Sequence, residues 1–500
     1  MTVLQLHTPE QAADWLQARV TGTLCADSRK AGKGDGFVAW PGAATDGRNY
    51  VSTALAAGVS SCLVEHEGSE IYGFTGERVA TFEGLKAATG PIAAAYFGAP
   101  SADLQLVAVT GTNGKTSTAW WLAQALGRLG RRCGIVGTLG IGEPDALVPN
   151  GLTTPDPVLL QQQLRRFADE GFAACALEAS SIGLEEGRLD STRIQVAVFT
   201  NFTQDHLDYH ASMSEYWQAK KKLFSWPGLQ AAVINGDDAK GLELSRSLAD
   251  GALDIWTFSC KGPARLQAQK IHQGADDLNF EVVEGVERYR LAIPMVGLYN
   301  VSNLLGVICS LRALNISLMD AVHACANLLP VPGRTETLAV SGLPLVVIDY
   351  AHTPDALEKV LTALKPVALN RGGRLWCVFG CGGDRDASKR PLMAVAAEKN
   401  ADQVMVTSDN PRSEDPMAII GQIVQGFSQP HAAEVRADRA AAIADTLRLA
   451  SPRDVVLLAG KGHEDYQEIK GVKFSFSDRK QAQAVLDAMS EAFKREGATS

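Results

Sequence analysis

Short apolar runs alternate with amphipathic segments along most of the chain. In the middle of the sequence, apolar strands are expected at 104–109, 134–136, 173–177, 196–199 and 231–234. Segments with helical spacing, such as 158–170 and 214–224, lie between them. Strands that alternate with helices are typical of a largely parallel sheet whose faces are covered by helices.

The same alternation occurs on both sides of this central stretch. The first hundred residues predict strands at 37–39 and 61–65 and helices at 50–57 and 87–97. The last third predicts strands at 344–349, 375–379, 403–407 and 455–459, with helices at 354–364, 391–398, 417–424 and 439–449. The rhythm changes before this last third, where we expect an antiparallel insert at 254–290, helices at 302–314 and 318–329, and a hinge at 330–333.

These patterns predict an α/β protein of three domains, with boundaries near 1–100, 101–335 and 336–500. We expect an N-terminal α/β domain, a central parallel sheet that binds a mononucleotide, and a C-terminal Rossmann-like α/β domain. Ligands of such sheets collect where the parallel strands end, so the loops at those ends are the first candidates for a site.

Composition and charge argue against several classes of binding partner and location. The formal net charge of −9 argues against a general affinity for nucleic acid or acidic lipid. The apolar runs are all much shorter than a membrane span, and the N-terminus lacks the basic start and apolar block of a signal peptide. Nine scattered cysteines favour reduced thiols in a cytoplasmic protein, and Cys377 and Cys381 lack the second pair of a zinc set. We expect a monomer.

The strand at 104–109 runs directly into the sequence TGTNGKT at 110–116, and a helical segment follows. This context suits a phosphate-binding loop, in which glycines let backbone N–H groups surround phosphate oxygens. Lys115 can reach the terminal phosphates, and the Thr116 hydroxyl can bind Mg²⁺. The general pattern has glycine where this chain has Val109, so the loop is a variant. The alternative is a glycine turn that binds nothing.

Four further residues are candidates for a metal site. Glu178 ends an apolar strand and is a candidate Mg²⁺ ligand, with a helix-capping role as the alternative. His206 or Asp208 could join the metal from the polar loop at 199–210, which could equally be an ordinary hydrogen-bonded loop. The simplest interpretation of Lys220 is that it belongs to a solvent-exposed basic face of a helix. It could contribute to a Mg²⁺ site only if CO₂ converted it to a carbamate, which supplies anionic oxygens.

Three loops of the last third follow consecutive predicted strands, at 382–385, 409–412 and 460–464. Together they carry two arginines, a lysine, a histidine and a glutamate. Arginine forks match carboxylates, and Glu464 could hold an ammonium group, so the loops suggest a pocket for a zwitterion. Ordinary turn chemistry explains each loop singly, because Asn-Pro and Gly-Gly form turns without any ligand.

Taken together, these motifs resemble those of the Mur ligases, ATP-dependent amide-forming enzymes of bacterial peptidoglycan and cell-wall synthesis. The resemblance runs essentially from end to end. It rests on TGTNGKT at 110–116, EASS at 178–181, FTN at 199–201, DHLDY at 205–209, Ala219-Lys220, NVSN at 300–303, GRTE at 333–336, DYAH at 349–352, 380–385 and DNPR at 409–412. The last motif favours the branch of the family that adds diaminopimelate, because lysine-adding relatives usually lack its arginine.

The resemblance implies addition of meso-2,6-diaminopimelate to the D-glutamyl γ-carboxylate of UDP-N-acetylmuramoyl-L-alanyl-D-glutamate through an acyl phosphate, with ATP and Mg²⁺. It implies that the first domain holds the uridine nucleotide. The implied ATP contacts are Gly111, Thr112, Asn113, Gly114, Lys115, Thr116, Asn300, Arg334, Asp349 and His352. The implied contacts to the uridine-linked substrate are Ser28, Thr45, Thr153, Thr154, Ser180 and Arg188.

The remaining implied roles concern the metal and the amino acid. Mg²⁺ would be organised by Thr116, Glu178, His206 and Lys220 as its carbamate, with Lys115 also catalytic. Diaminopimelate would contact Arg385, Asp409, Asn410, Pro411, Arg412, Gly460 and Glu464. This chain departs from the family at Ile182, where histidine is frequent, and at Glu186, where glutamine is frequent. These departures bear on the details of dipeptide contact.

Three other functions stay open at this stage. A lysine-adding Mur ligase or a folylpolyglutamate synthase-like ligase would use the same ATP chemistry on different substrates. A phosphate-loop switch ATPase would turn over ATP without a small-molecule acceptor, but it would leave the outer two domains unexplained.

Overall fold

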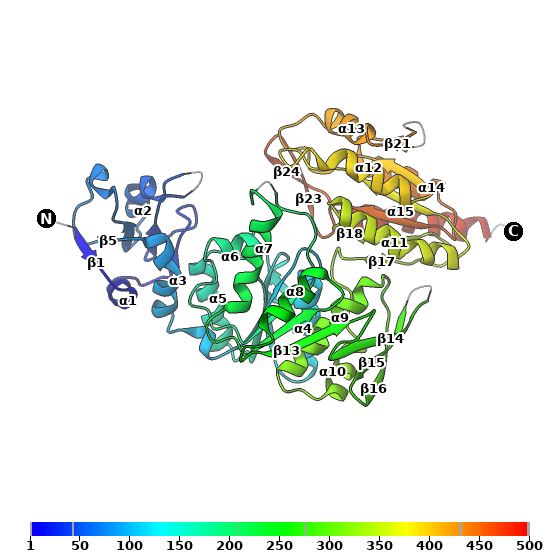
Figure 1. Cartoon of the computed structure of the whole chain (residues 1–500). Coiled ribbons are helices and arrows are strands. Elements are labelled where there is room, and N and C mark those ends of the chain that lie inside the picture. Colours follow the sequence, from blue (N-terminus) through cyan, green and yellow to red (C-terminus); the bar gives the residue numbers. More distant parts are fainter. Residues whose placement is uncertain (1–2, 43–44, 208, 275–276, 430–432, 498–500) are drawn as a thin grey trace.

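A computed structural model describes residues 3–42, 45–207, 209–274, 277–429 and 433–497. Its main strands form three sheets, drawn from residues 4–82, 105–293 and 336–459, and Figure 1 shows them in three successive bodies. The α/β architecture with parallel sheets predicted from the sequence is confirmed. The domain boundaries themselves stay a prediction.

The first body is a five-stranded parallel sheet in the order β1-β5-β4-β3-β2. Apolar side chains from both its faces are buried against the helices. Its strands are β1 (Leu4–Leu6), β2 (Leu24–Cys25), β3 (Gly36–Ala39), β4 (Ser61–Glu65) and β5 (Val79–Phe82), and its helices are α1 (Pro9–Gln17), α2 (Val51–Ala56) and α3 (Leu85–Tyr96).

The central body is built on an eleven-stranded sheet in the order β16-β15-β14-β13-β12-β11-β6-β10-β7-β8-β9. The strands are β6 (Gln105–Thr110), β7 (Cys133–Gly137), β8 (Gly140–Glu143), β9 (Ala146–Val148), β10 (Ala174–Glu178), β11 (Val196–Phe199), β12 (Ala231–Asn235), β13 (Asp254–Ser259), β14 (Leu266–Gln273), β15 (Leu278–Glu284) and β16 (Glu287–Ile293). The helices are α4 (Lys115–Arg128), α5 (Pro157–Asp169), α6 (Ser181–Glu185), α7 (Met213–Lys221), α8 (Ala239–Leu248), α9 (Tyr299–Ala313) and α10 (Leu318–Cys325).

Strand β6 lies at the centre of this sheet and explains the continuous apolar run. Val107 and Val109 pack with α4, α9 and α10 on one face, whereas Leu106 and Ala108 pack with α5 on the other. A parallel strand buried on both faces has no polar positions to alternate with. The phosphate-loop candidate therefore follows a strand that is covered on both faces.

The third body contains a six-stranded sheet in the order β17-β18-β22-β19-β20-β21. Only β17 runs antiparallel to its neighbour. The strands are β17 (Glu336–Leu338), β18 (Leu345–Asp349), β19 (Leu375–Phe379), β20 (Gln403–Val406), β21 (Ala433–Val435) and β22 (Val455–Ala459), with a hairpin of β23 (Tyr466–Ile469) and β24 (Val472–Ser475). The helices are α11 (Pro354–Asn370), α12 (Lys389–Asn400), α13 (Pro416–Val424), α14 (Arg439–Leu449) and α15 (Asp478–Gly497).

Three sequence expectations about elements are wrong. The expected antiparallel insert at 254–290 begins too early, because β13 pairs in parallel with β12 and extends the main sheet. Helix α10 ends at Cys325 instead of 329. Helix α11 continues past Pro366 to Asn370, because burial of Val367 and Ala368 offsets the one backbone hydrogen bond that proline removes.

Within the described residues, no helix is both long enough and apolar enough to cross a membrane.

Candidate active site

The phosphate-loop candidate connects β6 to the first residue of α4, Lys115. Gly114 has a φ of +85°, and a side chain there would collide with Asn303. The Lys115 ammonium donates to the carbonyl oxygens of Gly111 and Thr112, at 2.9 Å each. The loop is thus shaped by its glycines to expose a helix N-terminus, and its lysine is folded back over it.

The loop is held from the neighbouring strand end. The backbone N–H of Asn113 donates to Asn201 Oδ1 at 2.9 Å, and the Thr200 hydroxyl donates to the Asn113 carbonyl at 2.6 Å. The Asn113 side chain donates across to Asp355 Oδ2 on α11, at 3.1 Å, and the Thr203 hydroxyl donates to the same oxygen at 3.0 Å. The loop therefore touches the third body directly.

Glu178 stands at the end of β10, next to the start of α4. Its side chain is 1% exposed. Oε2 accepts from the Thr116 hydroxyl at 2.9 Å, and Oε1 accepts from the Thr138 N–H at 2.9 Å. A side chain at Gly137 would collide with this carboxylate, so the glycine makes room for it. A hydroxyl and a carboxylate this close form an oxygen pair that fits a small divalent cation.

Lys220 is buried, so its default reading as part of a solvated basic face is wrong. It is 1% exposed, donates to the Gly111 carbonyl at 2.9 Å, and lies 4.3 Å from the centre of the Tyr216 ring. Burial, together with the charge of Lys115, holds the pKa of Lys220 well below its usual range. An uncharged amine at this position is the form that reacts with CO₂.

The other metal candidates lie in the loop after β11. His206 has a φ of +53°, and its Nε2 is 3.6 Å from Asp205 Oδ2. Burial raises the pKa of Asp205, but the charge of His206, the hydrogen bond from the His206 backbone and the charge of Lys115 contribute to a net shift that is downward. Asp208 lies outside the described residues. In the described parts of the chain, no group of three or more His, Cys, Asp or Glu residues is placed to hold a metal ion.

The residues expected to contact the uridine-linked substrate fall in two places. Ser28 and Thr45 lie in the first body, where the Thr45 hydroxyl is 3.1 Å from that of Tyr50. The others gather beside Glu178. The Thr153 hydroxyl is 3.0 Å from that of Thr138, the Thr154 hydroxyl donates to the Glu178 carbonyl at 2.8 Å, and Ser180 caps α6.

Arg188 joins this group from the segment after α6. Its Nη1 donates to the Thr154 carbonyl at 2.8 Å, and its Nε donates to Glu186 Oε2, also at 2.8 Å. Glu186, noted as a departure from the family, is therefore the ion-pair partner of the arginine expected to contact the dipeptide.

The remaining predicted ATP contacts line the junction with the third body. Arg334 lies 4.6 Å from the centre of the Tyr350 ring, and its Nη2 is 3.4 Å from the Thr116 hydroxyl oxygen. Asp349 Oδ2 accepts from the Thr335 N–H at 2.7 Å, and Asn300 donates to the Val296 carbonyl at 2.8 Å. Burial lowers the pKa of His352 to about 4, so this ring is neutral at pH 7.

A cavity of about 540 Å³ opens between the central and third bodies. Residues 204–207 from the loop after β11 and His352 form part of its wall. The amino-acid candidates Arg385, Asp409, Asn410, Arg412, Gly460 and Glu464 line it as well, whereas Pro411 does not. The structure thus brings six of the seven predicted amino-acid contacts together, facing the loop that carries His206.

The arginines of this cavity are held differently. Arg412 has a φ of +51°, its Nη1 donates to the Gly383 carbonyl at 2.8 Å, and its Nε donates to Glu468 at 3.2 Å. Arg385 is exposed and forms no hydrogen bond or ion pair with any residue that the structure describes. One guanidinium is therefore fixed and the other is available to a ligand.

Sequence reasoning missed the side chains that support these loops. Arg390 is 1% exposed, donates to both oxygens of Glu414 at 2.8 Å, and donates to the Gly382 carbonyl at 3.1 Å. It therefore clamps two of the cavity loops together. The Tyr216 ring lies beside Lys220, and Thr138 donates to Glu178. No sequence signal marks these side chains, because their contacts form only in the folded chain.

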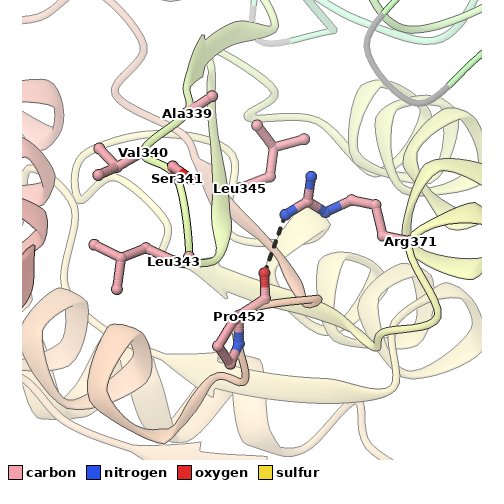
Figure 2. A pocket seen from close by; sticks show the side chains of 8 residues that line it. Ala339, Val340, Ser341, Leu343, Leu345, Arg371 and Pro452 are labelled. Atoms are coloured by element: carbon pink, nitrogen blue, oxygen red, sulfur yellow. Dashed lines mark hydrogen bonds between the residues drawn. The ribbon is translucent and has the colours of Figure 1, made fainter. Parts of the chain in front are cut away.

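A second cavity, of about 240 Å³, lies elsewhere in the third body and is shown in Figure 2. Its lining residues are Ala339, Val340, Ser341, Gly342, Leu343, Leu345, Arg371 and Pro452. Arg371 Nη2 donates to the Pro452 carbonyl across it, at 3.1 Å. The lining contains no residue that the sequence predicted for the site.

Residues 109–311 match the family described as the Mur ligase middle domain, and residues 333–462 match the Mur ligase glutamate ligase domain. The chain belongs to the Mur ligase family. A relative of this Mur ligase from Acidovorax sp. (strain JS42) is a UDP-N-acetylmuramoyl-L-alanyl-D-glutamate–2,6-diaminopimelate ligase. It is 59% identical over 489 residues, which cover 96% of this chain and 97% of the relative.

Two further comparisons indicate the same family. The same ligase from Ralstonia nicotianae is 47% identical over 490 residues, covering 95% of each chain. A solved structure of a UDP-N-acetylmuramoyl-L-alanyl-D-glutamate–2,6-diaminopimelate ligase is 35% identical, with a TM-score of 0.65, and covers 94% of this Mur ligase and 95% of that chain. The family resemblance seen in the sequence is confirmed.

Proposed function

We propose that this Mur ligase uses ATP to join meso-2,6-diaminopimelate to the D-glutamyl γ-carboxylate of UDP-N-acetylmuramoyl-L-alanyl-D-glutamate, a step of peptidoglycan precursor synthesis. One observation carries the proposal. The loops with Asn410, Arg412 and Glu464 open onto the same cavity as the loop with His206, where the phosphate-loop body meets the third body. Relatives that match nearly the whole chain bear this activity in their names.

The reaction needs an activated acid, because a free carboxylate would have to lose oxide. Phosphorylation by ATP turns it into an acyl phosphate with a good leaving group. Lys115 and the N–H groups of residues 111–116 would bind the phosphates and offset the charge of the transferred phosphoryl group. Asn300, Arg334, Asp349 and His352 would complete the nucleotide site from the junction with the third body.

We propose a bound Mg²⁺ at the Thr116–Glu178 oxygen pair, with His206 and a carbamate of Lys220 as further contributors. When bound, Mg²⁺ would neutralise phosphate charge. The chain itself contributes the Glu178 carboxylate, fixed by three hydrogen bonds, and the neutral amine of Lys220.

The amino acid would enter the cavity and be oriented from both ends. Arg385 and Arg412 would bind carboxylates, and Glu464 and Asp409 would hold an ammonium group. Asn410 would keep Glu464 in place by donating to it, while Gly460 leaves space beside Asp409. The free amine attacks the acyl carbon, and the tetrahedral intermediate releases phosphate as the amide forms. Arg188, Thr153, Thr154 and Ser180 would position the dipeptide, and Ser28 and Thr45 the uridine end.

The acyl phosphate must be kept from water, so we propose that the third domain, 336–500, closes over the central domain, 101–335, with the uridine nucleotide on 1–100. We further propose a monomer in the cytoplasm, where the nine free thiols would stay reduced.

The deciding experiment is phosphate release from ATP with the UDP-muramyl dipeptide, comparing meso-diaminopimelate with L-lysine. We expect release that requires both the dipeptide and meso-diaminopimelate, with L-lysine a poor substitute. Equal rates with L-lysine would point to a lysine-adding ligase. ATP turnover without the dipeptide would contradict the proposal and favour a switch ATPase.

A further inference from the structure

Lys461 is a buried cation behind the amino-acid cavity. Its side chain is completely buried, and it is not among the residues that line the cavity. Its Nζ donates to Asn410 Oδ1 and to Glu464 Oε2, each at 3.0 Å, and both of these residues do line the cavity. A buried ammonium is costly unless it is paired, so its position fixes that of its partners.

The first consequence concerns the side-chain amide of Asn410. Its Oδ1 accepts from Lys461 and also from the backbone N–H of Glu468, at 3.0 Å. Two donors on one atom identify it as the oxygen, so the NH₂ group must point the other way. There it donates to Glu464 Oε2 at 2.8 Å. Lys461 therefore helps to decide which face of the amide the cavity presents.

The second consequence concerns Glu464. Both hydrogen bonds to its carboxylate, from Lys461 and Asn410, reach the same oxygen, Oε2. Its Oε1 accepts no hydrogen bond from the residues that the structure describes. The carboxylate is thus held at one oxygen from behind and keeps the other for a donor in the cavity.

We propose that Lys461 is a positioning residue for the ammonium half of the amino-acid site. It holds the Asn410 amide and the Glu464 carboxylate so that Glu464 Oε1 receives the ammonium group of a diamino diacid, and it does not touch the substrate itself. The inference rests on the proposed function. It adds a specificity-determining residue that holds the ammonium end and, within the described residues, forms no hydrogen bond with Arg385 or Arg412 at the carboxylate end.

The test replaces Lys461 by methionine, which has a similar length and no charge. In the phosphate-release assay, we expect the KM for meso-diaminopimelate to rise about tenfold or more, because hydrogen bonds to a charged group are lost or misdirected. The KM values for ATP and the UDP-muramyl dipeptide should not change. Lys473→Met is the matched control, because Lys473 lies on the exposed hairpin over the Tyr466 ring and does not line the cavity.

Pimelate separates positioning from general damage, because it has both carboxylates and no amine. Its inhibition constant against meso-diaminopimelate should be the same in the Lys461→Met variant and in the unchanged protein. An equal rise for pimelate and diaminopimelate would mean a collapsed cavity and would overturn the proposal, as would an unchanged KM for diaminopimelate. If Lys461→Met does not fold, Lys461→Gln keeps a donor without the charge, and the same comparison decides.

The wild-type protein distinguishes the two levels of inference. If it releases no phosphate in response to meso-diaminopimelate, the proposed function fails. If it does so, and the variant binds diaminopimelate normally, only the role of Lys461 fails.

Discussion

At the scale of single residues, lysines in this protein gain their properties from burial. Lys220 occupies the last turn of α7, yet it points into the body and donates to the Gly111 carbonyl of the phosphate loop. Its neighbour Lys221 is only half-buried. Two adjacent lysines of the same helix thus have different surroundings, and burial holds the pKa of Lys220 well below its usual range.

We expect Lys220→Ala to reduce phosphate release by at least about a hundredfold, because the anionic oxygens of the proposed carbamate are lost. Small carboxylates such as acetate or formate should restore part of the rate by occupying the vacated space. The measurement is the rate of phosphate release against carboxylate concentration, with Lys221→Ala as the control that keeps its rate. The absence of rescue, together with an unmodified lysine in an intact-protein mass measurement at high CO₂, would contradict the carbamate.

Much of the site was predictable at this scale because glycine-rich and polar loops follow apolar strands. Glu178, Asp409 and Gly460 each end or follow a strand of the sheet, and the structure places them as expected. The direction of a side chain was not predictable from spacing. Lys461 belongs to a recognised loop, but its burial behind Glu464 depends on a contact with Asn410, 51 positions away.

At the scale of elements, one buried ion pair connects three elements of the third body. Arg439, the first residue of α14, donates to both oxygens of Asp478, the first residue of α15, and both side chains are 0% exposed. The same guanidinium donates to the Ala459 carbonyl at the end of β22, at 2.9 Å. The strand end that leads into Gly460 is therefore fixed by two helix starts.

We expect Arg439→Met to lower the free energy of unfolding by about 3–5 kcal/mol, because the Asp478 charge would stay buried without its partner. Changing Asp478→Leu in the same chain should recover much of this loss, since no unpaired charge remains. Urea unfolding followed by tryptophan fluorescence would measure both. A single variant that unfolds at the same urea concentration as the unchanged protein would contradict this account.

Elements were predicted well where burial determines their pattern. The apolar segments at β11, β19 and β22 match the structure at both ends. Short edge strands such as β9 and β21 were missed because three residues carry too little periodicity. The parallel pairing of β13 was also not predictable, because the direction of pairing depends on a partner strand elsewhere in the sequence.

At the scale of the whole molecule, two neutral histidines lie at the junction of the central and third bodies. Burial lowers the pKa of His352 and of His463 to about 4. His463 Nδ1 is buried without a hydrogen-bond partner in the described parts of the chain, and its ring lies 5.3 Å from that of Tyr350. Protonation of either ring would place a charge inside the junction.

We expect stability to be complete above about pH 6.5, where both histidines are neutral in the folded and unfolded chain. As the pH falls towards 4, the two histidines bind protons in the unfolded chain but stay neutral in the folded chain. The free energy of unfolding therefore falls by at most about 1.4 kcal/mol per pH unit per histidine. Thermal unfolding between pH 7 and 4.5 would measure the loss. His463→Phe should make the melting temperature less sensitive to acid, and an unchanged sensitivity would show that this ring does not contribute.

The cavity with Arg412 and Glu464 has walls from two bodies of the chain. A compound that filled this crevice would contact both bodies at once, so its affinity would depend on their being present together. Screens against either half alone would overlook it. Inhibitor discovery on this enzyme therefore has to begin from the intact polypeptide, with nucleotide added.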